Sequence, residues 1–391
     1  MSSIQALPTN VPRPQLPALT SLRFFAALWV VLYHLRELRV FSLPGLYSSF
    51  AGIGYVGVSF FFVLSGFILV YTYAGRECTP ARFWRARFAR IYPAYAFSLL
   101  ATIPILSGTL SNHSNVVLSA HPIGGMLLVL VLLQAWVPPL AMVWNGVAWS
   151  LSDEAFFYLG FPWLLKGLAR LGRERLIMLA FGCWAASLLV TSTYISVAPD
   201  GAAMLSGGGY AFWRYMVQFN PLLRAPEFIL GAACGYCFLK FPPDKKWASA
   251  LVLGGLALIA VPVLLPGTIL YPMLHSGFLA PGFAAVVMGL ALAPRWAALL
   301  DGRALVLLGE ASYSLYLLHL PLMVYLFYLV RGAVFQPQSW ASSVLYLAIA
   351  LGISTGVFWF VERPGRKLLR PRPQTAPGGL PEAAVAVAGE G

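Results

Sequence analysis

Long apolar stretches separated by short polar breaks follow one another along most of this 391-residue chain. The stretches are close in length to the roughly 20 residues with which a helix crosses a bilayer. Apolar and polar residues do not alternate within them, so the pattern does not favour a membrane β-barrel. We therefore expect an all-α, polytopic membrane helix bundle built from eleven apolar segments, at residues 19–38, 52–73, 91–107, 122–138, 148–168, 176–196, 221–239, 248–265, 277–294, 305–330 and 341–361.

Lysine and arginine gather in every second polar break, as they do in the cytoplasmic loops of membrane proteins. These breaks lie at residues 76–90, 166–175, 240–246, 295–303 and 363–372. Three apolar segments stand between the first two breaks, although the number of crossings between loops on one side must be even. We expect that residues 122–149, interrupted by Pro138 and Pro139, contain a re-entrant or interfacial piece. The prediction is about ten transmembrane helices with both termini in the cytoplasm.

The two ends of the chain differ in composition from the part between them. Residues 1–18 are rich in proline and lack the basic start, apolar stretch and cleavage site of a secretory signal, so we expect a retained cytoplasmic tail. Residues 371–391 consist mainly of Pro, Gly, Ala and Glu without an aromatic residue, which predicts a disordered cytoplasmic tail. Residues 19–370 form the predicted membrane domain.

Composition excludes the soluble classes of protein. Hydrophobic residues make up 59% of the chain and charged residues only 10%, against roughly 25% charged in soluble domains. The 26 Lys and Arg residues exceed the 13 Asp and Glu residues, but they lie between apolar segments, so they indicate topology and not nucleic acid binding. Cys234 and Cys237 form a CxxC pattern inside an apolar segment without a second pair or a nearby His, which favours helix packing over a metal site.

Ionisable residues inside apolar segments are costly to insert and therefore mark candidate functional sites. Arg23 and His34 lie eleven positions apart on the first segment, so they share a helix face with a rise of about 16 Å between them. The alternative is that Arg23 is an interfacial anchor and His34 a histidine satisfied by a neighbouring helix. His319 on the tenth segment is expected at a depth similar to that of His34, and Glu154 lies on the fifth segment.

Two arginines of the first basic break are candidates for binding a phosphate group. Arg87 and Arg90 are three positions apart and therefore project from one helical face. Their guanidinium groups present planar sets of donors that suit phosphate oxygens. Ordinary enrichment of basic residues on the cytoplasmic side explains the same residues without a ligand.

Seven motifs in a fixed order resemble the acyltransferase-3 family of membrane O-acyltransferases over residues 19–370. The resemblance includes the Arg-x10-His first helix, the Arg-x-x-Arg motif and a Trp-Ser-Leu-Ser-x-Glu block. Asp153 departs from the family pattern, in which an apolar residue precedes the glutamate. The motifs are SLRFFAALWVVLYH (21–34), GYVGVSFFFVLSGFIL (54–69), FWRARFARIYPAY (83–95), WSLSDEAFFYL (149–159), PEFILGAACG (226–235), ASYSLYLLHLPL (311–322) and VERPGRKLL (361–369).

The resemblance implies an enzyme of the bacterial cytoplasmic (inner) membrane that transfers an acyl group, usually acetyl, from cytoplasmic acyl-CoA. The implied acceptor is a hydroxyl of a carbohydrate, either a cell-surface polysaccharide or its lipid-linked precursor. Acyl-CoA, the sugar acceptor and membrane lipid are then the partners, and neither a metal nor nucleic acid is expected.

Six residues carry the roles that the resemblance implies. His34 is the expected general base, Glu154 orients its imidazole or binds the acceptor, and His319 polarises the thioester or holds an acceptor hydroxyl. Arg23, Arg87 and Arg90 are expected to hold the CoA phosphates. The pantetheine arm is then expected to run along the face of the first helix that carries Ala26 and Val30.

A secondary transporter or flippase is the main alternative, because mid-membrane charges also occur in such proteins. The chain shows no symmetry between its halves, and a carrier has no evident use for the Arg-x-x-Arg motif. A structural or sensor membrane protein is a further alternative, for which the number of buried ionisable groups is excessive.

Overall fold

Helices account for all regular structure in the described residues of the computed structural model, which are 13–40, 45–111, 115–207, 209–329 and 339–370. The predicted C-terminal tail and most of the N-terminal tail lie outside these ranges. The longer helices are α1 (Pro17–Glu37), α3 (Gly57–Tyr73), α4 (Pro80–Ala101), α8 (Trp149–Ala169), α9 (Arg173–Val197), α11 (Pro221–Lys240), α12 (Ala248–Leu264), α14 (Ala280–Ala291), α16 (Ser312–Val324) and α17 (Trp340–Val357).

Shorter helices connect these elements or cap their ends. They are α2 (Leu46–Gly52), α5 (Ile103–Ser111), α6 (Val116–Ala120), α7 (Pro122–Leu130), α10 (Phe212–Phe219), α13 (Tyr271–His275), α15 (Arg303–Glu310) and α18 (Arg363–Leu369). Several helices begin with residues that suit a helix start. Pro17, Pro80 and Pro221 lack the N–H that the first helical turn leaves unpaired, and the Asn220 side chain accepts a hydrogen bond from the Leu222 N–H at 3.0 Å.

Seven helices of the described ranges are long and apolar enough to cross a membrane, which identifies an integral membrane protein. The pair α15 and α16 meets the same criterion jointly, with a bend of 61° between its members. Exposed apolar side chains such as Leu189 on α9 and Leu253 on α12 are consistent with lipid around the bundle.

The region between α4 and α8 contains only short helices. α7 has nine residues and is followed by two turns of three residues each, at Gln134–Trp136 and Pro138–Leu140. Nine helical residues span about 14 Å, which is less than half the thickness of the hydrocarbon core. The apolar segment at 122–138 therefore does not form one spanning helix.

The first basic break is not a loop, contrary to our expectation for residues 76–90. α4 starts at Pro80 and continues for 22 residues, so Arg87 and Arg90 lie well inside a helix. The reason is local: Pro80 suits the first helical position, and the Ala and Arg residues that follow are good helix formers.

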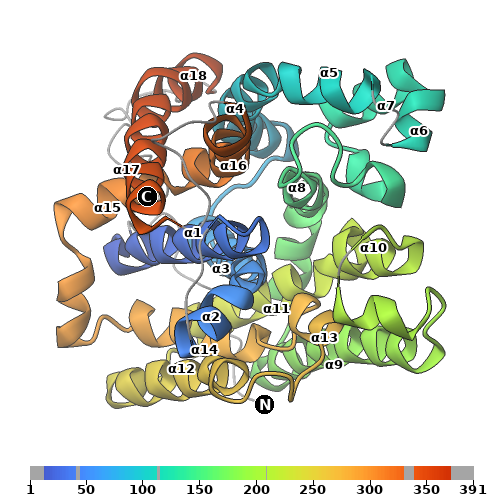
Figure 1. Ribbon diagram of the computed structural model, residues 1–391. Coiled ribbons are helices and arrows are strands. Elements are labelled where there is room, and N and C mark those ends of the chain that lie inside the picture. The colour runs from blue at the N-terminus through green and yellow to red at the C-terminus, as the bar shows by residue number, and fades with distance from the viewer. Residues whose placement is uncertain (1–12, 41–44, 112–114, 208, 330–338, 371–391) are drawn as a thin grey trace.

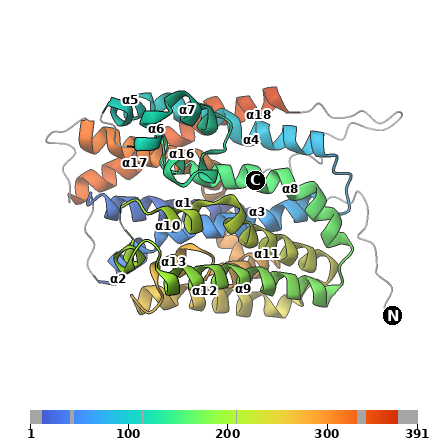
Figure 2. The same cartoon turned by 90° about the vertical axis from the view of Figure 1, so that its right-hand side faces the viewer.

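The helices pack in three groups, which Figures 1 and 2 show from two directions. α1, α3 and α8 occupy the middle of the bundle. On one side of them lie α9, α11, α12 and α14, and on the other side lie α4, α16, α17 and α18. The middle helices therefore face protein on both sides, and they carry three of the six predicted site residues, Arg23, His34 and Glu154.

Glycines allow a close helix contact between α3 and α11. A Cβ atom on Gly66 would lie 2.1 Å from the Phe228 carbonyl oxygen, and one on Gly231 would lie 2.0 Å from the Val63 carbonyl oxygen. No side chain fits at either position without separating the two backbones. The contact therefore fixes α11 against the middle layer.

Gly231→Ala is expected to lower the thermal stability of the protein in detergent, because the added methyl group collides with backbone. Overpacking of this kind costs about 1–3 kcal/mol. Gly254→Ala on α12 is the matched control, since a Cβ there meets nothing within 4 Å. Equal melting temperatures for the two variants would contradict the close contact.

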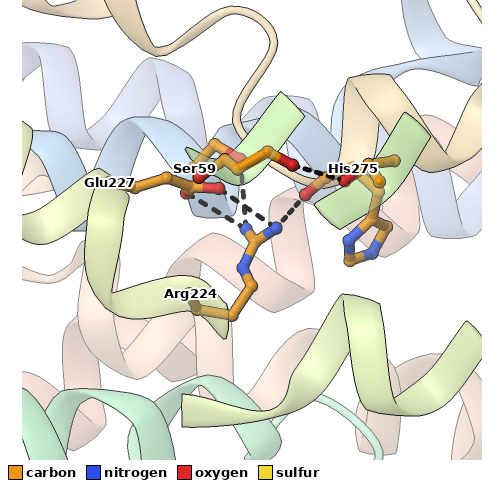
Figure 3. A network of polar contacts seen from close by, with 6 residues as sticks. Ser59, Arg224, Glu227 and His275 are labelled. Carbon is orange, nitrogen blue, oxygen red and sulfur yellow. Dashed lines mark hydrogen bonds and ion pairs between the residues drawn. The ribbon is translucent and has the colours of Figure 1, made fainter. Parts of the chain in front are cut away.

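A buried ionic network joins α3, α11 and α13 (Figure 3). The Arg224 guanidinium, 1% exposed, forms an ion pair with Glu227 at 3.2 Å and donates to the Ser59 hydroxyl at 3.1 Å. It also donates to the backbone carbonyl of His275. A buried charge needs such partners, so Arg224 and Glu227 serve the packing of α11 against α3 and α13.

Candidate active site

Three predicted arginines and the predicted glutamate line one cavity of about 100 Å³. Arg23 comes from α1, Arg87 and Arg90 from α4, and Glu154 from α8. We call this space the arginine cavity. Its remaining walls are side chains of α3 and α16, including Phe61, Ser65, Ser312, Tyr313 and Tyr316.

The arginine cavity carries an excess of positive charge. Arg90 interacts electrostatically with Arg23, Arg87 and Arg366, whereas Glu154 is the one carboxylate among the described residues that line the space. Glu362 forms an ion pair with Arg366 and accepts a hydrogen bond from the Ser314 hydroxyl at 2.6 Å, so that arginine is already compensated. The remaining positive charges favour an anionic ligand.

Arg87 owes its position to aromatic neighbours. Its guanidinium carbon lies 5.9 Å from the ring centroids of both Tyr73 and Phe83, and the residue is 6% exposed. Contact with ring faces stabilises a partly desolvated cation. Arg87 is therefore held toward the interior of the bundle, whereas Arg82 and Arg85 on the same helix are exposed.

Glu154 lies with the arginines and not with His34. Its Oε1 atom accepts a hydrogen bond from the Tyr158 hydroxyl at 2.7 Å, one turn further along α8. The expectation that Glu154 orients the imidazole is therefore not met by this geometry. Asp153 points elsewhere: it is fully buried, does not line the arginine cavity, and interacts electrostatically with Arg224.

His34 and His319 contact each other, although 285 positions separate them in the sequence. The Nε2 atom of His319 lies 3.1 Å from the Nδ1 atom of His34, and the ring centroids are 4.9 Å apart. His319 is fully buried, while His34 is partly exposed. The sequence predicted that His34 and His319 lie at a similar depth, and in the structure the two side chains contact each other.

Backbone carbonyls determine which nitrogens of this pair carry protons. His319 Nδ1 lies 2.7 Å from the Tyr316 carbonyl oxygen, which only accepts, so this nitrogen holds the hydrogen. In neutral His319 the Nε2 atom must then accept from His34 Nδ1–H, which also faces the Val30 carbonyl at 3.0 Å. The Nε2 atom of His34 is left without a proton and can act as a base.

Aromatic side chains separate the arginine cavity from the two histidines. Tyr316 lines the cavity with Phe61, and its ring centroid lies 6.0 Å from that of His319. The hydroxyl of Tyr316 lies 2.8 Å from the Ser150 hydroxyl and donates to the Val147 carbonyl at 3.0 Å. The cavity therefore ends one aromatic layer away from the histidine pair.

The face of α1 that carries Ala26 and Val30 is not an open channel. Both residues are buried, and a Cβ atom on Gly57 would lie 2.8 Å from the Ala26 carbonyl oxygen and 3.0 Å from a Val30 methyl group. α3 packs directly on this face. The expected path of a pantetheine arm along Ala26 and Val30 is therefore wrong, and the arginine cavity runs instead between α3, α4, α8 and α16.

Sequence reasoning missed the tyrosines of the site. Tyr313 and Tyr316 precede His319 at intervals of three, and Tyr158 follows Glu154 by four, which are spacings that place side chains on one helix face. Tyr313 donates to the Ile91 carbonyl at 2.8 Å and so ties α16 to α4. Within the described ranges, no three His, Cys, Asp or Glu side chains gather as a metal site would require.

Comparison with known proteins assigns the chain to a family. The acyltransferase domain model of the acyltransferase-3 family matches residues 16–362. Acyltransferase MdmB of Streptomyces mycarofaciens is 30% identical over 401 residues, which cover 95% of this chain and 97% of MdmB. No solved structure matches the chain significantly.

Two relatives are longer than this chain. O-acetyltransferase OatA of Staphylococcus aureus is 24% identical over 375 residues, which cover 90% of this chain and 57% of OatA. Peptidoglycan O-acetyltransferase OatA of Listeria monocytogenes is 24% identical over 397 residues and is likewise covered over 57% of its length. The family match includes all six predicted site residues. The protein is therefore a membrane acyltransferase and belongs to the acyltransferase-3 family.

Proposed function

We propose that this enzyme transfers an acyl group, in the first place acetyl, from acyl-CoA to a hydroxyl group of a carbohydrate. The observation that carries the proposal is the contact between His34 and His319, one aromatic layer beyond a cavity lined by Arg23, Arg87 and Arg90. The arginines of the cavity suit an anionic acyl donor, and the histidine pair supplies a base. The names of the two O-acetyltransferase relatives support a hydroxyl acceptor, and one of them names peptidoglycan.

The donor site is the arginine cavity. CoA carries phosphate groups at one end and a thioester at the other, so a site for it needs cations at its mouth and an uncharged route inward. Arg87 and Arg90 on one face of α4, with Arg23 opposite them on α1, supply the cations. Phe61, Ser65 and Tyr316 form the uncharged walls that lead toward the histidines.

The chemistry needs one base and no change of oxidation state. The acceptor oxygen attacks the thioester carbonyl carbon while His34 Nε2 takes the hydroxyl proton. The carbon–sulfur bond then breaks, and the imidazolium returns the proton to the departing CoA sulfur. His319 holds the tautomer of His34 throughout, because its own Nδ1–H stays on the Tyr316 carbonyl.

The helices also support the expected ten crossings. The seven apolar helices and the bent pair α15–α16 make eight, and α4 and α8, with 22 and 21 residues, are long enough to make ten. Charged residues, four arginines on α4 and Asp153, Glu154 and Lys166 on α8, explain why composition alone does not single these helices out. We place both termini and the arginine cavity on the cytoplasmic side of a bacterial inner membrane, where acyl-CoA is available.

The test compares cells that carry the gene, cells without it, and cells with His34→Ala. Surface glycans and their lipid-linked precursors are measured by mass spectrometry. The proposed function predicts that species heavier by one acyl group occur only with the unmodified gene. Identical acylation in all three strains would refute it, provided that the variant reaches the membrane at normal levels.

A further inference from the structure

A second cavity, of about 680 Å³, lies on the other side of the histidine pair. We call it the aromatic cavity, after the three rings that line it together with three uncharged polar side chains. These residues are Trp144, Tyr210, Tyr215, Thr102, Asn115 and Asn145.

Two helices line both cavities at different heights. On α16, Tyr313 lines the arginine cavity and Val324 lines the aromatic cavity, which are about 16 Å apart along the helix axis. On α4, Arg90 and Thr102 stand in the same relation, about 18 Å apart. His319 lies between the two heights on α16, so the histidine pair lies between the two cavities along this helix.

Residues of the α16 turn that carries His319 form part of the wall of the aromatic cavity. Leu320 and Pro321, the next residues after His319, both line the cavity. The Asn145 side chain donates to the Leu317 carbonyl at 3.0 Å and to the Ser98 hydroxyl at 3.2 Å. These bonds fix the cavity wall to α16 and α4, and α16 carries His319, which contacts the proposed base His34 at 3.1 Å.

The lining of the aromatic cavity selects against charge. None of the described side chains that line it is ionisable at neutral pH as a cation or carboxylate. Arg214 lies behind Tyr215, 5.7 Å from the ring centroid, but its guanidinium is buried and donates to the Met204 and Gly209 carbonyls. An anionic ligand would lose its hydration without gaining a cationic partner among the described residues that line the cavity. Aromatic walls with a few polar groups suit instead an uncharged, hydroxylated ring with an apolar face.

We propose that the aromatic cavity is the acceptor site, and that it selects uncharged glycosides with an apolar substituent over anionic sugars. This inference rests on the proposed function and adds to it the place and the chemistry of the acceptor. The donor and the acceptor then reach the histidines from opposite ends of the bundle. The two substrates would meet only at the layer of His34, His319 and Tyr316.

The test uses Met142, a cavity residue that is 39% exposed, in full-length protein in lipid nanodiscs. In Met142→Cys, maleimide labelling is scored by mass on the peptide that carries residue 142, so the four native cysteines do not interfere. 4-Nitrophenyl β-glucoside is expected to slow labelling at least fivefold, and 4-nitrophenyl β-glucuronide is not. Ile123→Cys on α7, 71% exposed and outside the cavity, is the control and should be unaffected by either compound.

A second measurement follows acetyl transfer from acetyl-CoA to the glucoside. Met142→Lys is expected to raise the KM for the glucoside at least tenfold without changing the acetyl-CoA concentration that gives the half-maximal rate, and Ile123→Lys should change neither. Three results would overturn this inference and leave the proposed function standing. They are acetyl transfer to the glucoside without protection of residue 142, equal protection of residue 142 by the glucuronide, and an unchanged KM for the glucoside in Met142→Lys. Protection without any transfer would overturn the proposed function, and with it the assignment of the cavity to an acceptor.

Discussion

Replacement of His34 by alanine is expected to reduce acyl transfer by about 10²–10⁴-fold, the range that a general base contributes. The loss should appear in kcat, because His34 lies one aromatic layer away from the arginine cavity and is not among the residues that line it. Steady-state kinetics with the purified protein in lipid would show the change. The half-maximal concentration of acyl-CoA should remain close to that of the unmodified enzyme.

His121 provides the matched control for this substitution. It is an exposed histidine at the start of α7 and lines neither cavity, so His121→Ala should leave kcat unchanged. A His34→Ala protein with full activity would remove this imidazole from the mechanism. Loss of the protein from the membrane would instead point to a structural role, and the amount of folded protein must therefore be measured alongside the rate.

The double variant Arg87→Ala with Arg90→Ala is expected to raise the acyl-CoA concentration for half-maximal rate by roughly 10–100-fold. Hydrogen bonds between charged groups contribute about 1.5–3 kcal/mol each, and tenfold corresponds to about 1.4 kcal/mol. The expected range lies below the sum of two such losses, because Arg23 lines the same cavity and compensates in part. Initial rates over a range of acyl-CoA concentrations provide the measurement.

Arg82 and Arg85 offer a control with the same charge and the same spacing. They lie on α4, three positions apart like Arg87 and Arg90, but both are exposed. If the arginines served membrane topology alone, the two double variants would behave alike. An Arg82→Ala with Arg85→Ala protein that required as much acyl-CoA as the cavity variant would contradict a donor site on α4.

The membrane class and most helices followed from the sequence because a bilayer imposes a simple rule on length and polarity. The errors fell where other forces acted. α4 starts eleven residues earlier than its apolar segment, which begins at Ile91, because helix propensity does not require hydrophobicity. The segment at 122–138 is apolar but broken into short pieces, because α7 ends at Leu130 and Leu132 has a left-handed backbone conformation with a φ of 60°, which does not continue a helix.

The candidate site was predictable in its members but not in its arrangement. Spacing placed His34 and His319 at similar depth and put Arg87 and Arg90 on one face, and the structure brings each pair together. Helix spacing says nothing about which faces of different helices meet. The packing of α3 against Ala26 and Val30, and the place of Glu154 among the arginines, depend on such contacts between helices distant in the sequence.

The bend between α15 and α16 has an electrostatic consequence. It starts a new helix inside the bundle, and the first two residues of that helix, Ser312 and Tyr313, line the arginine cavity. The partial positive charge of a helix amino terminus, about half a unit, therefore faces the same space as the guanidinium groups. This field belongs to the backbone and persists when side chains are truncated, so the cavity keeps some attraction for phosphate in every arginine variant.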